Sequence, residues 1–209
     1  GGVCGEILIL GYTHPDNFPL LKKYNLIQTV VNYHYAGLLN EYGKPLRVHI
    51  KIDTGMHRLG ERPEQIEAIA RIFQMKNLKI EGAFTHLCVS DRTAPEDKAY
   101  TEAQGKAFWR VISTLREMGY SCPEVHLLAS YGLINYPNLS GDHARIGIAL
   151  YGVLSTRTDL QQCGLPLLPV LSVKVRIAAI KDLFAGEGVG YGLAYTAAEN
   201  RKIAILPIG

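Results

Sequence analysis

The chain has 209 residues, of which 47% are hydrophobic and 20% are charged, and its 22 basic and 19 acidic residues give a formal net charge of +3. These proportions indicate a globular protein with a sizeable core and exclude a disordered, collagen-like or disulfide-stapled chain. The charges form no long block of one sign, so we expect no nucleic-acid partner and no membrane contact. The four cysteines form no C-x-x-C pair, which argues against a zinc or redox site and favours reduced thiols in a cytoplasmic location.

Short apolar runs that read as β-strands alternate with longer segments of helical spacing. The expected strands cover residues 7–10, 27–31, 47–53, 80–86, 125–130 and 144–151. One expected helix is opened by Pro63, and a longer one follows Pro95 and ends at Gly119. The inward face of the longer helix is expected to comprise Tyr100, Ala103, Ala107, Val111, Leu115 and Met118.

This repeated order predicts parallel strands joined by crossover helices, in either a doubly wound sheet or a (β/α)8 barrel. No G-x-G-x-x-G segment opens a helix after the first strand, so we predict an α/β fold, a (β/α)8 TIM barrel missing its first strands. After about residue 164 the pattern alternates and glycines crowd one loop, which predicts the start of a C-terminal all-β domain. The expected domains are residues 1–160 and 165–209, and the apolar segments at both ends indicate a fragment of a longer chain.

Polar residues mark the C-terminal parts of the expected strands, where a barrel carries its functional side chains. They include Lys51, His86, Ser130 and Arg145. Taken singly, each residue of this kind is more often a cap, a turn residue or a hydrogen-bonded core group. Lys51 and Arg145 stand out, because a cation among apolar strand neighbours needs a partner or a ligand.

Ser130 and the Gly147-Ile148 pair follow neighbouring expected strands. A hydroxyl together with backbone N–H groups freed by glycine can hold a phosphate at the last two loops of a barrel. An equally weighted alternative is that Ser130 caps a helix and that Gly147 only permits close packing.

Four motifs in this order resemble the alanine racemase family. They are Lys51 to Gly60 (KIDTGMHRLG), Thr85-His86, Arg145 to Gly152 (RIGIALYG) and Gly190 to Thr196 (GYGLAYT). The resemblance implies a pyridoxal 5′-phosphate (PLP) enzyme with a barrel and a β-rich domain, working as a homodimer with shared active sites. It implies racemisation of a small amino acid, alanine, to supply the D-amino acid of the cell wall.

The resemblance also assigns cofactor contacts. Arg145 matches the residue that donates to the pyridine nitrogen of PLP, and His86 matches a histidine near the cofactor. Ser130, Gly147 and Ile148 match phosphate contacts.

Three further residues match the family's catalytic and substrate positions. Tyr191 matches a tyrosine that acts as one acid/base and is contributed to the other subunit's site. Arg58 matches an arginine placed for the substrate carboxylate and the cofactor hydroxyl, and Lys51 matches a lysine that is carbamylated in several members.

The chain departs from the family in three places. The essential lysine lies in a Lys-x-Asn/Asp-x-Tyr-Gly segment that is absent from these residues, so we expect the fragment itself to be inactive. A Gly-Tyr-x-Asp-Gly segment is also absent, and Ala129 stands where the family often has Asn. The texture from Leu128 to Pro137 is closer to the serine/alanine racemases of vancomycin resistance, which carry an N-terminal membrane domain.

Four alternatives stay open at this point. They are a serine racemase of the vancomycin-resistance type, a decarboxylase for a larger basic amino acid, a non-catalytic PLP-binding barrel, and a phosphate-binding barrel of unrelated chemistry. The Lys51 to Gly60 motif disfavours the decarboxylase, and the β segment with Tyr191 disfavours the non-catalytic PLP-binding barrel.

Overall fold

The computed structural model describes residues 4–139 and 141–208 and divides the chain into two compact units. The first unit ends at Leu168 and the second begins at Pro169. Each unit is described by itself below. No helix in the described part of the chain combines the length and the apolarity that a membrane crossing needs.

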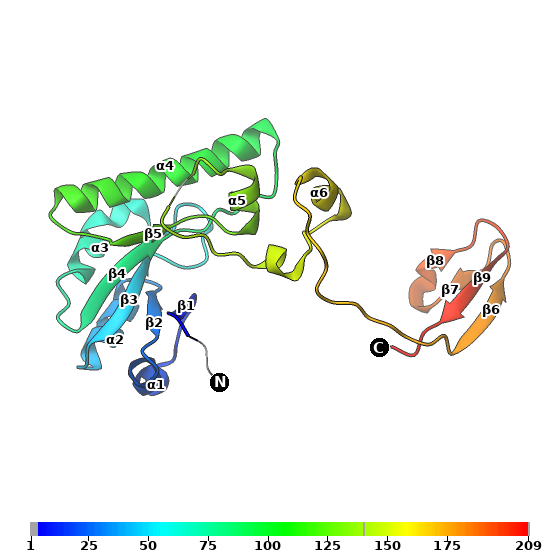
Figure 1. The fold of residues 1–209 in the computed structure, drawn as a ribbon, viewed down its shortest axis with the longest axis horizontal. Coiled ribbons are helices and arrows are strands. Elements are labelled where there is room, and N and C mark those ends of the chain that lie inside the picture. The colour runs from blue at the N-terminus through cyan, green and yellow to red at the C-terminus, as the bar shows by residue number, and fades with distance from the viewer. Residues whose placement is uncertain (1–3, 140, 209) are drawn as a thin grey trace. The chain divides into compact units, whose positions relative to one another are not determined.

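The first unit is built on a five-stranded parallel sheet (Figure 1). Its strands are β1 (Leu8–Ile9), β2 (Ile27–Val30), β3 (Leu46–Lys51), β4 (Leu78–Phe84) and β5 (Glu124–His126). Their spatial order follows the chain, β1-β2-β3-β4-β5, so the strand order never reverses as it does in a doubly wound sheet. The prediction of a partial barrel is therefore confirmed.

Helices connect these strands, and two more follow the last of them. They are α1 (Phe18–Lys23), α2 (Tyr33–Glu41), α3 (Ile66–Ile72), α4 (Pro95–Glu117), α5 (Ser130–Asn135) and α6 (Arg157–Gln162), with short 3₁₀ turns at Pro15–Asn17, Pro63–Gln65 and Ile148–Tyr151. Neighbouring helices α2, α3 and α4 pack side by side in chain order, and α4 runs along the sheet in Figure 1. They bury a core centred on β2, β3 and β4.

Helix α4 starts and stops where the sequence predicts. Pro95 occupies its first turn, and Gly119 follows its end with φ +87°. The Gly119 N–H donates to the Arg116 carbonyl and the Tyr120 N–H to the Leu115 carbonyl, which closes the helix in a Schellman motif.

The predicted inward face of α4 is only partly right. Val111 and Leu115 are buried, whereas Tyr100 and Met118 are 44% and 46% exposed. The buried stripe consists of Thr101, Gln104, Gly105, Phe108, Val111, Ile112 and Leu115. The buried face includes Phe108 and Ile112, which the predicted face left out, and the polar Gln104, which bonds to Cys88 and His86.

The sixth predicted strand, over residues 144–151, is wrong. The structure has a single parallel bridge between Ala129 and Arg145, followed by the 3₁₀ turn Ile148–Tyr151. Strand β5 already ends at His126, and within residues 4–139 and 141–208 this bridge is the only β pairing of Arg145.

The second unit is antiparallel. Strand β6 (Ala179–Leu183) pairs with β9 (Arg201–Ile205), and β7 (Gly188–Val189) pairs with β8 (Tyr195–Thr196) around a 3₁₀ turn at Tyr191–Leu193. Its strands bear out the prediction that an all-β region begins in this part of the chain.

The loop after β3 returns against the end of its own strand. The Asp53 N–H donates to the Glu61 carbonyl, and the Glu61 N–H donates to the Lys51 carbonyl. Gly60 permits this return, because it has φ +110° and a Cβ there would lie 2.8 Å from both the Asp53 nitrogen and the Lys51 oxygen. The last glycine of the KIDTGMHRLG motif is thus required by close backbone contact.

We predict that Gly60→Ala lowers the free energy of unfolding by at least about 2 kcal/mol, since a positive φ and a backbone clash coincide. Gly37→Ala in α2 is the matched control, because a Cβ there meets nothing within 4 Å and alanine favours a helix by about 0.5–1 kcal/mol. Urea unfolding of the whole protein measures both. Equal stability of the two variants would contradict this account of the loop.

Candidate active site

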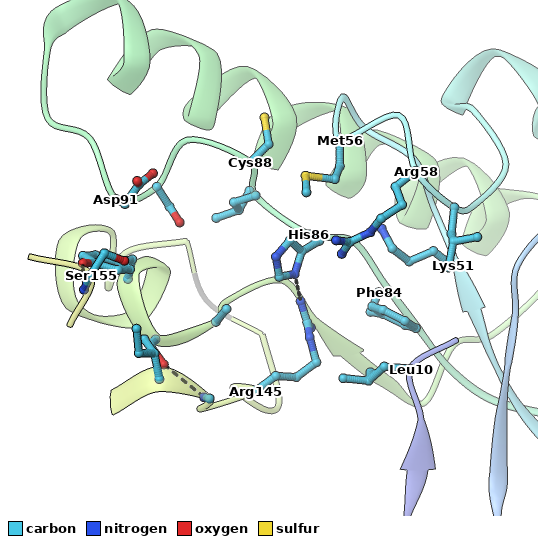
Figure 2. A pocket seen from close by; sticks show the side chains of 18 residues that line it. Leu10, Lys51, Met56, Arg58, Phe84, His86, Cys88, Asp91, Arg145 and Ser155 are labelled. Atoms are coloured by element: carbon cyan, nitrogen blue, oxygen red, sulfur yellow. Dashed lines mark hydrogen bonds between the residues drawn. The ribbon is translucent and has the colours of Figure 1, made fainter. Parts of the chain in front are cut away.

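A cavity of about 470 Å³ lies at the C-terminal ends of the strands (Figure 2). All but one of the sequence-predicted site residues line it: Lys51, Arg58, His86, Ser130, Arg145, Gly147 and Ile148. They come from the ends of β3 and β4, the start of α5 and the segment after the Arg145 bridge. A ring of strand ends is where a parallel barrel places its site.

The charge of the cavity is mainly positive. Lys51, Arg58 and Arg145 line it, with Asp91 as the single carboxylate among its lining residues. No side chain among residues 4–139 and 141–208 forms an ion pair with Arg58. The cavity is therefore suited to an anionic ligand.

Asp53 shapes the loop that carries Arg58. Its carboxylate accepts hydrogen bonds from the Gly55 and His57 N–H groups at 3.2 and 2.9 Å. These bonds, together with His57, hold the pKa of Asp53 below its ordinary value even though burial works in the opposite direction. Asp53 therefore holds the conformation of the loop that positions Arg58.

Gln104 ties the two loops beside the cavity together, and the sequence analysis missed it. Its side-chain oxygen accepts from the Cys88 N–H at 3.0 Å, and its amide donates to the His86 carbonyl at 3.3 Å and to the Thr54 hydroxyl at 3.5 Å. The Thr54 and Thr85 hydroxyls also contact each other at 2.7 Å. A single glutamine in an apolar helix stripe is the signal that could have revealed this role.

Arg145 is the most heavily bonded cation of the site. One terminal nitrogen donates to the His126 ring at 2.5 Å and to the His126 carbonyl at 3.1 Å. The other donates to the carbonyls of Thr85 at 2.7 Å and Leu127 at 3.1 Å, and lies 3.4 Å from Nδ1 of His86. Within the described residues, Nε–H is the donor of this guanidinium that has no acceptor.

His126 was not predicted as a site residue. It is 2% exposed, its ring stacks on Phe84 with an interplanar angle of 9°, and it lies between Arg145 and His49. Sequence reasoning treated it as part of a strand. A histidine four residues before the predicted phosphate serine was the available signal.

The positive charges change the protonation of their neighbours. Burial, followed by the Arg145 charge, lowers the pKa of His86 to about 4, so this imidazole is neutral at pH 7. The same two causes, in the same order, lower the pKa of Lys51 to about 8. Lys51 is 5% exposed, donates to the Ile52 carbonyl at 3.2 Å and lies over the Phe84 ring.

Ser130 joins the two segments of the predicted phosphate site. Its hydroxyl accepts from the N–H groups of Gly147 at 3.0 Å and Ala149 at 3.3 Å. The alternative of a helix cap and a close packing contact is therefore wrong: Ala129 is the N-cap residue of α5, and a Cβ on Gly147 would meet nothing within 4 Å. The space beside the Gly147 Cα is open, so no close packing contact requires a glycine there.

Tyr131, which sequence reasoning did not single out, fixes the wall next to Ser130. Its hydroxyl donates to the Asp159 carboxylate at 2.6 Å and accepts from the Ser155 N–H at 2.7 Å. Tyr131 and Ser155 both line the cavity. Helix α5 and the segment before α6 are thus joined by one phenol.

Tyr191 belongs to the second unit and is fully exposed. It lies between Gly190 and Gly192, whose φ angles are +78° and +67°. These left-handed residues make the tight turn that presents the phenol outward.

Comparison with known proteins agrees with these motifs. Residues 1–155 match the family described as "Alanine racemase, N-terminal domain", and residues 170–209 match "Alanine racemase, C-terminal domain". The chain belongs to the alanine racemase family. Its fold is that family's TIM barrel, represented by part of the parallel sheet, followed by the β domain.

Relatives in this family carry several names. The chain is 42% identical over its whole length to an amino-acid racemase of Enterococcus faecalis and 34% identical over 99% of its length to a serine/alanine racemase of Enterococcus gallinarum. A solved alanine racemase of Clostridium difficile 630 superposes with a TM-score of 0.80 at 33% identity over the whole chain. The chain spans 30% of each Enterococcus protein and 55% of the solved one.

We predict that His86 stays neutral down to about pH 5, because its pKa of about 4 reflects burial and the Arg145 charge. Since a neighbouring cation disfavours the charged imidazole, Arg145→Gln should raise this pKa. A proton NMR titration of the His86 ring in both proteins measures it. A wild-type pKa above 6, or a lower pKa in the variant, would contradict the prediction.

Proposed function

We propose that the protein containing this chain racemises a small amino acid, alanine foremost, with PLP held in the cavity at the strand ends. The observation that carries the proposal is that Lys51, Arg58 and Arg145 line the same cavity as Ser130 and Gly147, while the Arg145 Nε–H has no acceptor among the described residues. The lysine segment that the family uses to attach PLP is absent from these 209 residues, so the proposal concerns the whole protein.

The residues present fit PLP. A volume of about 470 Å³ lies in the range of ordinary small-molecule sites. Ser130, Gly147 and Ile148 would hold the phosphate, since the Ser130 oxygen accepts from the Gly147 N–H, which leaves the hydroxyl hydrogen to donate, and Gly147 leaves room. Arg145 would face the pyridine nitrogen, with His86 beside it. When bound, PLP supplies an electron sink for the carbanion at the substrate Cα.

Arg145 would supply the hydrogen-bond donor for the pyridine nitrogen. Burial lowers the pKa of the Arg145 guanidinium to about 10, so Arg145 remains a cation and a donor at neutral pH. Because a guanidinium offers only N–H groups, Arg145 would donate to an unprotonated ring nitrogen and would not protonate it. The donor would thereby limit the negative charge that the ring accepts and would favour return of the proton over side reactions.

Arg58 would bind the substrate carboxylate, and Lys51 would set its position. Arg58 lines the cavity without an ion-pair partner of its own among the described residues, and Lys51 lies beside it (Figure 2). The two neighbouring cations repel each other, and the Arg58 charge is one of the causes that lower the pKa of Lys51. A carbamate on Lys51 would reverse the sign of its charge and turn repulsion into attraction.

Tyr191 would act as the acid/base on one face of the substrate, donated by the partner chain of a homodimer. Full exposure on a glycine-flanked turn suits a side chain that enters another subunit's site. A lysine outside this chain would serve the opposite face. A phenol titrates near 10, so the cations Arg58 and Arg145 would have to favour its ionised form.

For the whole protein, Tyr191→Phe should slow exchange of the alanine Cα hydrogen by about 10²- to 10⁴-fold for one enantiomer, and less for the other. Deuterium incorporation into L- and D-alanine, followed separately in D₂O, measures this. The control is Tyr24→Phe, an exposed phenol that lines no cavity described above. Unchanged exchange of both enantiomers in Tyr191→Phe would refute the assignment.

Lys51 is proposed to carry a carbamate. Its neutral amine attacks carbon dioxide, an N–C bond forms and a proton leaves to solvent, so the reaction requires the unprotonated form that a pKa of about 8 makes available. The carbamate should therefore be more abundant at pH 8.5 than at pH 6. Carbon-13 NMR with labelled bicarbonate detects it, and Lys51→Arg is the control; a signal unaffected by Lys51→Arg would overturn the proposal.

Serine is the second candidate substrate. The specific observation is the 34% identity to a serine/alanine racemase over 99% of the chain. Parallel assays of racemisation with alanine and serine distinguish the two. Release of carbon dioxide in place of racemisation would overturn both and favour a decarboxylase.

A further inference from the structure

Two buried histidines lie behind Arg145, away from the cavity. His126 Nδ1 is 2.5 Å from a terminal nitrogen of Arg145, and His126 Nε2 is 3.0 Å from His49 Nδ1. Among the residues that the structure describes, His49 Nε2 has no hydrogen-bond partner, and it lies 3.7 Å from the Glu124 carboxylate. The four side chains form a continuous line from the cavity to a half-exposed carboxylate.

The fold makes a slot for His49. The register between β3 and β4 shifts between Val48 and His49, and the residue opposite is Gly82. A Cβ on Gly82 would lie 2.7 Å from Cε1 of His49 and 2.4 Å from the Glu124 carbonyl oxygen. The bulge and the glycine together admit an imidazole where a second side chain would exclude it.

The hydrogen bonds determine where the ring protons lie. A guanidinium can only donate, so His126 Nδ1 must accept from Arg145, and a neutral His126 carries its proton on Nε2. That Nε2–H then donates to His49 Nδ1, which leaves the His49 proton on Nε2, directed at Glu124. Every proton in the line points away from Arg145.

Both rings have reason to be neutral. Burial lowers the pKa of His49, and burial followed by the Arg145 charge lowers that of His126 to about 3. The charged and titratable groups that act on the pair are Glu6, Lys51, Glu81, Glu124, His143 and Arg145.

We infer that His49 is a positioning residue that acts through His126: the pair, locked in one tautomer, holds Arg145 with its Nε–H toward the cavity. His126 occupies one terminal nitrogen of the guanidinium, and the Thr85 and Leu127 carbonyls occupy the other. Without His49, the His126 ring would have a buried N–H with no acceptor and would tilt away, which releases Arg145. A contact between Arg145 and PLP rests on the proposed function. The tautomers of His49 and His126 do not depend on it.

Nitrogen-15 NMR of the whole protein labelled in histidine tests the lock without any cofactor. Correlation of ring carbon protons with both nitrogens distinguishes the tautomers. We expect His49 and His126 to be neutral with the proton on Nε2 at pH 7. A proton on Nδ1 of either ring, or a charged ring, would overturn the inference whether or not the protein binds PLP.

Two substitutions of His49 test the positioning role. His49→Asn keeps an oxygen acceptor near the Nδ1 position, whereas His49→Leu removes it and leaves the buried His126 N–H without an acceptor. We expect PLP binding to weaken about tenfold in His49→Leu and less than about threefold in His49→Asn. His34→Leu, on the exposed side of α2, is the control.

These measurements test the positioning role of His49 and the proposed binding of PLP separately. A purely structural role would weaken binding in proportion to the loss of unfolding free energy, with no rescue by asparagine, and that pattern would overturn the inference. Absence of PLP binding by the wild-type protein would contradict the proposed function, and the tautomer measurement would still decide on the lock.

Discussion

The site depends on one constraint: a partly buried guanidinium needs acceptors for its terminal N–H groups. Arg145 meets this by donating to the carbonyls of Thr85, His126 and Leu127 and to the ring of His126, so it joins the ends of β4 and β5. A buried cation that is not paired with a carboxylate is stabilised only if these bonds are good. These acceptors hold the side-chain conformation of Arg145, and its Nε–H is left as a donor for a ligand in the cavity.

The same charge sets the chemistry around it. It is the second cause, after burial, of the low pKa values of His86 and Lys51, so one neutral imidazole and one readily deprotonated amine lie beside a permanent cation. The permanent positive charge of the cavity thus comes from guanidinium groups that keep their protons at neutral pH, while His86 is neutral and Lys51, with a pKa of about 8, can lose a proton near neutral pH. This division suits a site that must hold an anionic ligand and move single protons.

Much of this was predictable from sequence, for physical reasons. Strand periodicity and the absence of a dinucleotide-type glycine motif led to the barrel, and Gly119 marked the end of α4 because a left-handed residue closes a helix. Seven predicted site residues line one cavity because parallel strand ends converge. Gln104 and His126 were missed because their roles depend on long-range hydrogen bonds, which local patterns do not encode.

The central claim is that the cavity between Arg145 and Ser130 binds PLP. A crystal structure of the whole protein grown with PLP tests it most directly. The account predicts density in this cavity, with the phosphate at Ser130 and Gly147 and the pyridine nitrogen facing Nε of Arg145. Density for PLP at another place, or with its phosphate at Arg145, would contradict it.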